Sequence, residues 1–518
     1  MTKPAPQTHT LLPARPFRSY LEYLEASGGS AIPAARAMAP EELVAELSRS
    51  GLRGRGGAGF PTGAKWRSVR EHPCPTKYVV CNAAEGEPGT FKDRFLLRRN
   101  PYATLEGMRI AAHAIGATRG YLALKGSFTR ELARVRGALE EMKAQLDGFA
   151  IEVVEGPEEY LFGEEKALLN VIEGEGPLPR EADNPPYEVG LFATPGSPNP
   201  ALVNNAESYA HVPGILRNGA AWFREVGTSD TPGTVIFTVS GDVERPGVYE
   251  REAGITLREL IFDVAGGLGE GRSLKAILCG VSAAPIGPDH LDTPADFGHL
   301  AAIGAGLGSA GFVVYDDRRN LARVAQAVAR FLYVESCNQC SACKTNLGLA
   351  SAALDELAGH DGGTSPASGG VAASDLADRA AFSARHAPQA NRCYLPVQGS
   401  IVIPGIVKRF REDFAGAALA GEILIPKMVD FDEECGVFSY DDDQPRKLPS
   451  WTYRAAPPSH LPPPAPPVGG RSVRVTLDPD VVAALLDPDD VASDEDIGEH
   501  ANAALRDWLA SRGAPGAT

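Results

Sequence analysis

The sequence predicts an α/β domain built on a parallel sheet, followed by a strand-rich unit and a helical domain that holds an iron–sulfur cluster. The first observation is an alternation of strand-like and helix-like segments between residues 77 and 146. The second is the spacing of Cys337, Cys340 and Cys343, which directly follow a helical pattern. Alternating strands and helices favour a parallel sheet covered by helices. Thiolates separated by two residues are typical of [4Fe-4S] sites.

Composition limits the class of protein. A chain of 518 residues with 43% hydrophobic residues is long enough for three or four domains. Eight cysteines are too few for a disulfide scaffold, and the proline-broken N-terminus lacks a secretory pattern, so we expect a cytoplasmic protein. No apolar run approaches the roughly 20 residues of a membrane-spanning helix, so no direct membrane insertion is expected. The net charge of −16 argues against nucleic-acid binding, which leaves proteins and small redox molecules as expected partners.

Residues 1–50 carry one helical pattern, Pro40 to Leu47, in an otherwise irregular lead-in. A glycine-rich stretch follows, GLRGRGGAGFPTGAKW, with five glycines in residues 51–59. Glycines let backbone N–H groups approach an anion, and neighbouring cations add complementary charge. These cations are Arg53, Arg55 and Lys65. The spacing matches neither the Walker A nor the Rossmann fingerprint, so a phosphate loop and a flexible surface turn are equally favoured by these residues alone.

The next segment places a polar loop at the end of a strand. KYVVC, residues 77–81, is typical of a short buried strand, and it leads into the loop NAAEGEPG at residues 82–89. A helix over residues 100–115, a strand over 120–125 and a helix over 129–146 complete the alternation. Ligands of open α/β sheets bind beyond the carboxyl ends of strands, so this loop is a candidate binding loop.

Residues 233–317 have a different pattern. The strand TVIFTVSG, a turn, the strand VYE and a helix from Thr256 to Val264 succeed one another. Residues 306–311 match G-x-G-x-x-G, but they precede the strand Phe312 to Tyr315, whereas a dinucleotide fingerprint follows a strand. We therefore interpret this glycine run as a tight turn, and the segment shows no catalytic group.

The three clustered cysteines need a fourth ligand from elsewhere. Position 347, where a nearby fourth cysteine is usual, is Leu347. Cys393 is the better candidate and Cys435 the second. A structural zinc site, which favours two separated Cys-x-x-Cys pairs, and a disulfide framework are the alternatives. A helix at residues 346–357 and another before Cys393 suggest a small bundle around the cluster, and such a cluster implies electron transfer.

Four ordered motifs resemble a known family. They are GRGGAGF from Gly54, Lys65-Trp66, CNAAEGEPGTFKDR from Cys81 and YLFGEEKALLN from Tyr160. With the cluster cysteines they resemble the flavin-bearing, NADH-oxidising (51 kDa-type) subunit of respiratory complex I, a module that also occurs in NAD-linked hydrogenases and formate dehydrogenases. The resemblance implies a Rossmann-like FMN domain, a ubiquitin-like β-grasp (SLBB-like) insert and a helical [4Fe-4S] domain.

The resemblance also implies the cofactor residues. FMN would lie on the glycine-rich loop, and NADH would stack on its ring. The implied FMN residues are Gly54, Gly56, Gly57, Lys65, Asn82, Glu85, Tyr160, Glu164, Asn204 and Asn205. The implied NADH residues are Phe60, Glu85, Glu87, Glu165 and Tyr187, of which Glu87 and Glu165 position the nicotinamide without acting as catalysts. The implied cluster ligands are Cys337, Cys340, Cys343 and Cys393.

The residue types suit these roles without the resemblance. Amides and carboxylates are partners for a flavin's ribityl hydroxyls and ring edge, and Phe60 offers a face for an adenine ring. Acidic residues around the nicotinamide oppose the extra phosphate of NADPH and so favour NADH. The plainer alternatives are that Glu164 and Glu165 are first-turn acids of a helix and that Tyr160 belongs to the core.

Several positions depart from the family pattern. Ala84 stands where an aspartate is usual, and Ser68 where an aromatic residue is usual. Lys166 stands where a threonine is more familiar. Losing a carboxylate that accepts hydrogen bonds from a cofactor costs on the order of 1–3 kcal/mol. In the cluster motif, Asn338 and Lys344 are changed neighbours of the thiolates and are expected to shift the cluster potential.

The resemblance implies an NADH:acceptor oxidoreductase, in which a hydride passes from NADH to FMN and single electrons then pass to the cluster. No thioredoxin-like [2Fe-2S] domain precedes Gly51. A small [2Fe-2S] thioredoxin-like subunit, a ferredoxin or a larger dehydrogenase complex is therefore the expected partner. The alternatives are an NAD-reducing diaphorase subunit of a formate dehydrogenase or hydrogenase, and a non-catalytic iron–sulfur scaffold with a degenerate flavin site.

Beyond Tyr453 the chain departs from the family. Residues 455–470, AAPPSHLPPPAPPVGG, predict a semi-rigid linker. Residues 471–518, with four basic and ten acidic residues, resemble a ribbon-helix-helix unit only faintly, and they suggest dimerisation or docking rather than DNA binding. The expected domains are a lead-in (1–50), an FMN/NADH domain (51–232), a β-grasp unit (233–317), a helical cluster domain (318–454), the linker and the tail.

Overall fold

The computed structural model describes residues 11–181, 183–194, 196–358, 372–415, 427–441, 444, 447 and 448. The predicted linker and acidic tail lie outside the described residues.

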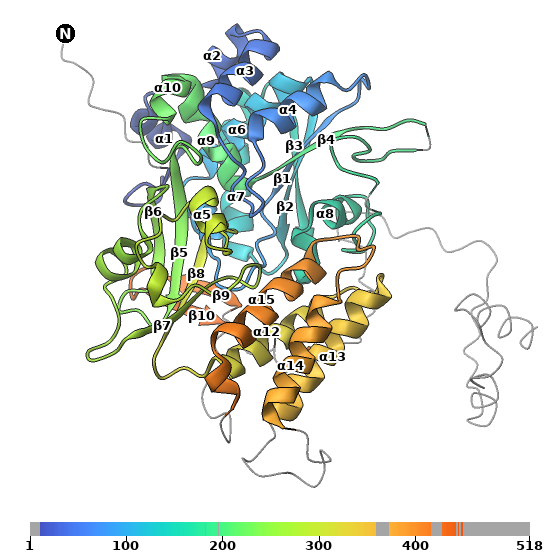
Figure 1. Ribbon diagram of the computed structural model, residues 1–518. Coiled ribbons are helices and arrows are strands. Elements are labelled where there is room, and N and C mark those ends of the chain that lie inside the picture. Colours follow the sequence, from blue (N-terminus) through green and yellow to red (C-terminus); the bar gives the residue numbers. More distant parts are fainter. Residues whose placement is uncertain are drawn as a thin grey trace, which may run out of the picture. The chain divides into compact units, whose positions relative to one another are not determined.

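A four-stranded parallel sheet forms the centre of the first part of the chain (Figure 1). Its strand order is β3-β2-β1-β4. Asn82, the last residue of β1, pairs with Asn205, the last residue of β4, so the two strands end at the same edge. The strands are β1 (Tyr78–Asn82), β2 (Arg119–Lys125), β3 (Ala150–Gly156) and β4 (Ala201–Asn205). The predicted parallel α/β fold is confirmed.

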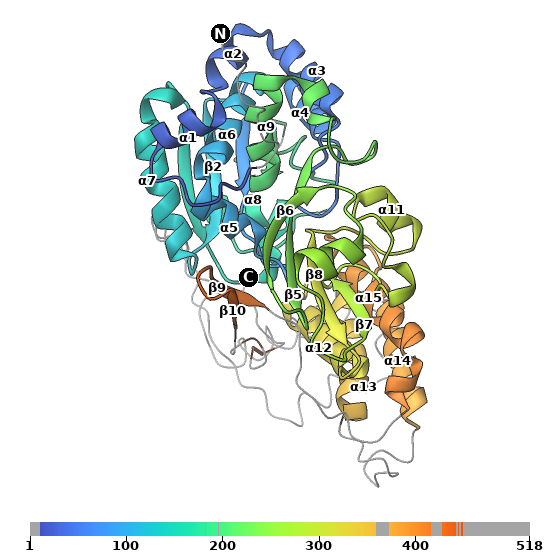
Figure 2. The same cartoon turned by 90° about the vertical axis from the view of Figure 1, so that its left-hand side faces the viewer.

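Helices cover both faces of this sheet because successive strand residues point in opposite directions. Val79 and Cys81 of β1 are buried in one core with α6 and α9, whereas Val80 is buried on the opposite face with α8. Figure 2 shows α6, α7 and α9 grouped on one side of the strands. The helices of this part are α4 (Thr62–Glu71), α5 (Lys92–Arg99), α6 (Pro101–Ile115), α7 (Thr129–Leu146), η1 (Tyr160–Gly163), α8 (Glu165–Ile172), α9 (Ala206–Asn218) and α10 (Ala220–Phe223).

The N-terminal region is more helical than the sequence predicts. Helices α1 (Tyr20–Ser27) and α2 (Ile32–Ala37) precede α3 (Pro40–Ser50), so the expectation of an irregular lead-in is wrong for this part. Both helices are too short to show a clear periodicity, and short helices depend on tertiary packing. That packing includes Tyr23, which donates a hydrogen bond to the buried Glu106 of α6.

A buried carboxylate anchors the segment before α1. Glu250 accepts hydrogen bonds from the backbone N–H groups of Leu11 and Leu12, at 2.7 Å each, and from the Thr234 hydroxyl at 2.5 Å. Burial raises the pKa of Glu250 to about 7, and these hydrogen bonds oppose the rise.

A second sheet has the strand order β6-β5-β8-β7, with a parallel central pair and antiparallel outer pairs. Its strands are β5 (Thr234–Gly241), β6 (Gly247–Glu252), β7 (Leu274–Cys279) and β8 (Gly311–Asp316). Phe312 and Val314 face a core with η2 (Glu259–Val264), while Val313 and Tyr315 face the helical part. The segment predicted as a helix from Thr256 is a single π-helical stretch that begins at Glu259. The remaining short helices here are η3 (Pro288–His290) and α11 (Phe297–Ala302).

Four helices pack together after the second sheet and share one core (Figure 1). They are α12 (Leu321–Glu335), α13 (Ser341–Ala358), α14 (Ala373–Arg385) and α15 (Leu395–Arg409), followed by η5 (Arg411–Phe414). A hairpin of β9 (Met428–Asp432) and β10 (Val437–Tyr440) then returns to α5, where Arg94 donates to the Met428 carbonyl at 2.8 Å. Within the described residues, no helix combines the length and apolar character needed to cross a bilayer.

Candidate functional site

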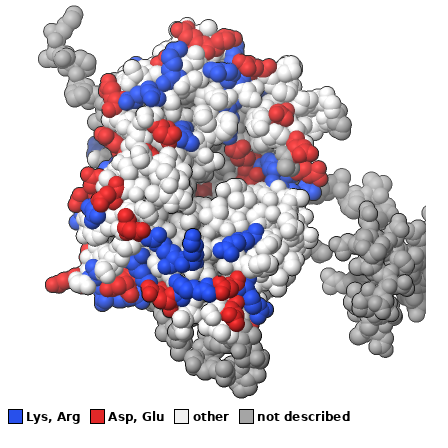
Figure 3. All heavy atoms as spheres, in the orientation of Figure 1, with Lys and Arg blue, Asp and Glu red and all other residues white. Residues whose placement is uncertain are grey.

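A cavity of about 1040 Å³ opens beyond the carboxyl ends of β1 and β4. Figure 3 shows the face on which it opens, with Lys and Arg side chains gathered below the hollow. Every residue for which a flavin or NADH role is predicted lines this cavity: Gly54, Gly56, Gly57, Phe60, Lys65, Asn82, Glu85, Glu87, Tyr160, Glu164, Glu165, Tyr187, Asn204 and Asn205. The second sheet and the segment before α15 supply further walls, including Cys393.

The glycine-rich loop forms an open cradle of backbone donors. The Gly54 N–H donates to the Phe60 carbonyl at 2.9 Å, which closes the loop at its base. In the described chain, the N–H groups of residues 56–58 have no acceptor. Gly57 has φ 125°, a conformation that residues with a Cβ rarely adopt. A Cβ on Gly56 would lie 3.2 Å from the Asn205 Cβ. The loop therefore brings free amides to the cavity where a side chain would intrude.

Two of the predicted loop cations point elsewhere. Arg55 is buried and donates to the carbonyls of Pro232 and Thr234 at 2.9 and 3.1 Å, and it does not line the cavity. Arg53 lines the rim but pairs with Asp230 at 2.7 Å. The expectation that Arg55 faces a phosphate is therefore wrong, because its guanidinium anchors the loop to β5.

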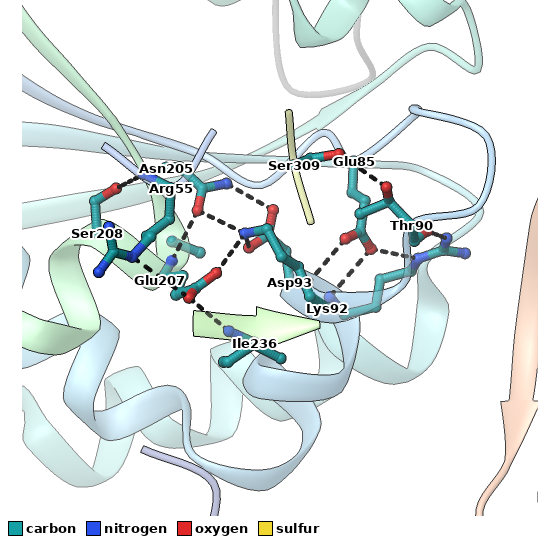
Figure 4. A network of polar contacts seen from close by, with 12 residues as sticks. Arg55, Glu85, Thr90, Lys92, Asp93, Asn205, Glu207, Ser208, Ile236 and Ser309 are labelled. Atoms are coloured by element: carbon teal, nitrogen blue, oxygen red, sulfur yellow. Dashed lines mark hydrogen bonds and ion pairs between the residues drawn. The ribbon is translucent and has the colours of Figure 1, made fainter. Parts of the chain in front are cut away.

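A buried lysine that the sequence analysis missed lies at the cavity instead (Figure 4). The Lys92 ammonium is 2.8 Å from carboxylate oxygens of Asp93 and Glu207 and donates to Asn205 Oδ1 at 3.0 Å. Burial lowers the pKa of Lys92, but the two carboxylates raise it more, so the lysine stays charged. Burial raises the pKa of Asp93 to about 6, against the opposing effect of Lys92. The only signal for this cluster in the sequence was the adjacent pair in the motif FKDR.

Two predicted cofactor residues are engaged by the protein itself. Glu85 accepts from the Asp93 N–H at 3.0 Å and pairs with Arg94 at 3.0 Å, so it caps the start of α5. Asn205 caps α9 through the Glu207 N–H at 3.0 Å and donates to Asp93 at 2.6 Å. Both residues shape the cavity through the elements that they fix.

Glu87 and Tyr160 form a polar link across the cavity. The Tyr160 hydroxyl donates to Glu87 Oε2 at 2.5 Å and accepts from Gln398 of α15 at 2.8 Å. The other carboxylate oxygen of Glu87 accepts from the N–H of Val281, in the turn after β7, at 2.8 Å. Burial raises the pKa of Glu87, although these hydrogen bonds oppose the rise. The link joins both sheets and the helical part.

The start of α8 supplies an acidic wall. Glu164 is the N-cap, and its Oε2 accepts from the N–H groups of Lys166 and Ala167 at 3.0 and 2.9 Å. Burial raises the pKa of Glu164 to about 7. Glu165 pairs with Lys65 at 2.6 Å. The first-turn interpretation therefore holds for Glu165, whereas Glu164 is the N-cap, and both acids line the cavity.

The remaining predicted amides connect strand ends to nearby loops. Asn82 donates to the Gly163 carbonyl at 2.8 Å. In the amide orientation that satisfies its neighbours, Asn204 accepts from Trp66 Nε1 at 2.8 Å.

Two of the departures from the family pattern, Ala84 and Ser68, have different surroundings. Ala84 is fully buried, lines the cavity and packs in the core beneath α8. Ser68 is on the exposed side of α4, in a shallow depression that it shares with Tyr187. Ser68, where the family usually has an aromatic residue, therefore lies beside the cavity and not in its lining. Its neighbour Tyr187 lines both the depression and the cavity.

The glycine run interpreted as a turn forms a cavity wall. Residues 304–309 all line the cavity. Gly308 lies opposite Gly57 of the glycine-rich loop, because a Cβ added to Gly57 would be 3.9 Å from the carbonyl carbon of Gly308. Ser309 and Thr90 share a hydrogen bond of 2.8 Å. The N–H groups of residues 306–309 lack acceptors within the described chain. The expectation of a turn is right, but its place in the site was missed, and the glycine density was the available signal.

The cysteines for which a cluster is predicted lie near one another. Burial raises the pKa of Cys343 to about 12, and the neighbouring thiols of Cys337 and Cys340 add to the rise. Burial also raises the pKa of Cys393, with contributions from Glu164, Cys337 and Cys343. Cys435 is exposed in the β9–β10 turn.

The arrangement of these thiols can be compared with the needs of a metal. Among the residues that the structure describes, no three His, Cys, Asp or Glu side chains converge on a point that a single metal ion would occupy. Thiolates of an iron–sulfur cluster bind different irons, so they need not converge.

The changed residues of the cysteine loop have structural roles. Asn338 has φ 66°, and asparagine adopts this left-handed region more readily than most residues. Lys344 donates to the carbonyls of Tyr333 and Ser336 at 2.9 and 3.0 Å and so caps α12. Glu335, buried at the end of α12, accepts from the Tyr160 N–H at 3.0 Å and from Lys447 at 2.9 Å. The end of the helix that precedes the cysteines is thereby tied to Tyr160, which lines the cavity.

Comparison with known proteins gives two family matches. Residues 47–214 match the Nuo51 FMN-binding domain, and residues 236–278 match the SLBB domain. The F 2 subunit of the NADH-quinone oxidoreductase of Rhizobium meliloti (strain 1021) is 39% identical over 338 residues, which cover 63% of this chain and 79% of that protein. The F subunit of the NADH-quinone oxidoreductase of Aquifex aeolicus (strain VF5) is 39% identical over 333 residues, which cover 62% of this chain and 76% of that protein.

A solved structure is similar as well. The air-oxidised crystal structure of an NAD⁺-reducing [NiFe]-hydrogenase has a chain that superposes with a TM-score of 0.66 at 32% identity. The similarity covers 79% of this chain and 68% of that chain.

Proposed function

Because the chain belongs to the family of NADH-quinone oxidoreductase F subunits, it is an FMN-binding NADH oxidoreductase subunit, and we propose here which residues carry out its work. The observation that carries the proposal is that one cavity of about 1040 Å³ extends from the glycine-rich loop to Cys393.

The glycine-rich loop is the proposed cradle of the FMN phosphate. Its free N–H groups at residues 56–58 suit an anion, and the space at Gly56 and Gly57 would be filled by a Cβ. Lys92 adds a buried positive charge at the same end of the cavity. The residues present therefore fit the phosphate of the cofactor.

The polar wall is proposed to orient the isoalloxazine and the nicotinamide. Glu164 retains one carboxylate oxygen beyond its cap contacts, and Asn82 and Asn204 lie at the strand ends beside it. Glu87 and Glu165 are held by Tyr160 and Lys65, so their carboxylates are fixed before a nucleotide arrives. Phe60, half exposed in the cavity, and Tyr187 offer faces for the adenine ring.

The thiols of Cys337, Cys340, Cys343 and Cys393 are the proposed ligands of a [4Fe-4S] cluster. Soft sulfur donors suit iron–sulfur clusters, and the buried thiols would lose their protons on metal binding. When bound, FMN accepts a hydride and releases electrons singly, which an iron–sulfur cluster can take up. Because Cys393 lines the cavity, the proposed cluster borders the proposed flavin site.

The test is anaerobic purification of the full chain, followed by assays of acid-released flavin, iron and sulfide and by titration with NADH. Stoichiometric FMN whose absorbance is bleached by NADH, with about four irons per chain, is the expected result. Iron without flavin, or flavin that does not respond to NADH, would contradict the proposed site and favour a scaffold.

A second candidate is a diaphorase that reduces NAD⁺ with electrons from a partner, and the similarity to the NAD⁺-reducing hydrogenase favours it. Both candidates use the same site and need a partner that exchanges electrons with the cluster, such as a small [2Fe-2S] protein, a ferredoxin or a larger dehydrogenase complex. Affinity purification of the full chain from its source, with identification of the co-purified proteins, separates the two candidates.

A further inference from the structure

Lys166 connects the acidic wall of the cavity with the loop of the fourth proposed cluster ligand. It is the second residue of α8, directly after Glu164 and Glu165. Its ammonium donates to the backbone carbonyl of Arg392 at 2.5 Å and to that of Glu181 at 3.3 Å. The side chain thus extends from α8, which covers the first sheet, to the loop that precedes α15.

The contacted carbonyl belongs to the peptide group of Cys393. A peptide group consists of the carbonyl of one residue and the N–H of the next, so the Arg392 carbonyl and the Cys393 N–H lie in one plane. The Cys393 N–H has no acceptor among the described residues. On the other side, Asn391 Nδ2 donates to the Cys393 carbonyl at 2.7 Å. Lys166 and Asn391 therefore fix the peptide planes on both sides of this cysteine.

The surroundings of this ammonium are acidic. Glu164 caps the same end of α8 through the N–H groups of Lys166 and Ala167, and like Cys393 it lines the cavity. Lys166 opposes the upward shift that burial gives the pKa of Glu164. The nearby Glu181 carboxylate pairs with the Arg392 guanidinium at 3.2 Å. The ammonium therefore lies against the peptide group that precedes Cys393, at the end of α8 that carries Glu164.

We propose that Lys166 is a positioning residue of the iron–sulfur site, which orients the Cys393 peptide and holds a positive charge beside it that raises the reduction potential of the cluster. The inference rests on the proposed function, because it requires a cluster at these cysteines. Adding one electron to a cluster held by four thiolates increases its negative charge, and a fixed cation stabilises that form. Polarising the Cys393 peptide also strengthens its N–H as a donor toward sulfur.

The test is an EPR-monitored redox titration of the intact holoprotein in three forms: wild type, Lys166→Met and Lys166→Arg. Methionine keeps most of the stem without the charge, whereas arginine keeps the charge and the donors. We expect Lys166→Met to shift the one-electron equilibrium about tenfold toward the oxidised cluster, which equals a potential about 59 mV lower. Lys166→Arg is expected to stay near the wild-type value.

Lys408→Met is the matched control. This exposed lysine lies near the C-terminal end of α15. The helix begins two residues after Cys393, and Lys408 is about 20 Å along the helix axis from that beginning. Its removal changes the net charge equally and is expected to leave the potential unchanged.

Each outcome decides the inference. A wild-type potential in Lys166→Met, or an equal shift in Lys408→Met, would overturn it. If Lys166→Met loses iron while Lys166→Arg keeps both iron and potential, the contact with the Cys393 peptide is supported; if both lose iron, the inference is wrong. Wild-type protein without iron and sulfide would instead refute the proposed cluster.

Discussion

Gly57 is the residue on which the proposed phosphate cradle depends most. It has a φ of 125° in a loop that lines the cavity and whose N–H groups at residues 56–58 have no acceptor within the described chain. An alanine in such a conformation costs about 1–3 kcal/mol. The neighbouring acids and amides, by contrast, include side chains such as Glu85 and Asn205 that are satisfied by the protein.

We expect Gly57→Ala to lose most of its FMN while remaining folded, because the strained loop withdraws its amides from the phosphate. FMN content after purification and the melting temperature are the measurements. The control is Gly116→Ala, since Gly116 has φ 79° at the end of α6 with open space around it and should lose stability but keep FMN. Full FMN content in Gly57→Ala would refute the cradle.

Glu250 gives the chain a predictable response to pH. Burial raises its pKa from 4.5 to about 7, so the folded chain holds a proton that the unfolded chain releases above pH 4.5. The corresponding stability is fully present below about pH 4.5 and is lost as pH rises through about 7, with a slope of up to about 1.4 kcal/mol per pH unit.

In the variant Glu250→Gln the pH-dependent part of the free energy of unfolding should disappear, because glutamine does not titrate. Its side-chain oxygen can still accept a hydrogen bond from the N–H group of Leu11 or Leu12. Denaturant unfolding at pH 5, 6, 7 and 8 is the measurement. If the difference in stability between wild type and variant is the same at all four pH values, Glu250 is not the titrating group.

At the scale of elements, the loop at residues 304–309 makes the second sheet part of the site. Gly308 has φ 52°, and a Cβ there would lie 3.1 Å from the Cys279 sulfur and 3.2 Å from the Ser282 hydroxyl. The loop would have to shift relative to the glycine-rich loop that it faces.

For Gly308→Ala we expect a KM for NADH that is five- to tenfold higher, which corresponds to about 1–1.4 kcal/mol, with unchanged FMN content. Gly271→Ala is the control, because Gly271 has φ 75° in the same unit and no atom near its missing Cβ. Loss of FMN, or an unchanged KM, would show that this wall does not contact the nucleotide.

The sequence predicted the local parts of the site better than its assembly. The strand KYVVC and the loop after it follow from short-range patterns, and the helix 129–146 was predicted at its observed bounds. The direction of the Arg55 side chain and the pairing of Lys92 with Glu207 depend on elements more than 100 residues away in the sequence. Local periodicity cannot predict such contacts. For the same reason the contact between Gly57 and Gly308 could not be foreseen.

At the scale of the whole molecule, cysteine substitutions test whether the fourth cluster ligand comes from the loop before α15 or from the β9–β10 turn. We expect Cys393→Ser to lose most of its iron and its EPR signal, whereas Cys435→Ser keeps both, because Cys435 is exposed in the β9–β10 turn. Iron content per chain is the measurement. The opposite result would assign the fourth ligand to Cys435.

The cavity has a consequence for biogenesis. Its lining begins at Arg53 and ends at Ile401, and it includes loops from both sheets and from the helical part. A ribosome must therefore have released all of these segments, and they must have packed together, before a flavin can find its complete binding site. For the proposed flavin site, a nascent chain that ends before α15 has no finished pocket to fill, so loading of FMN there would be a late event in maturation.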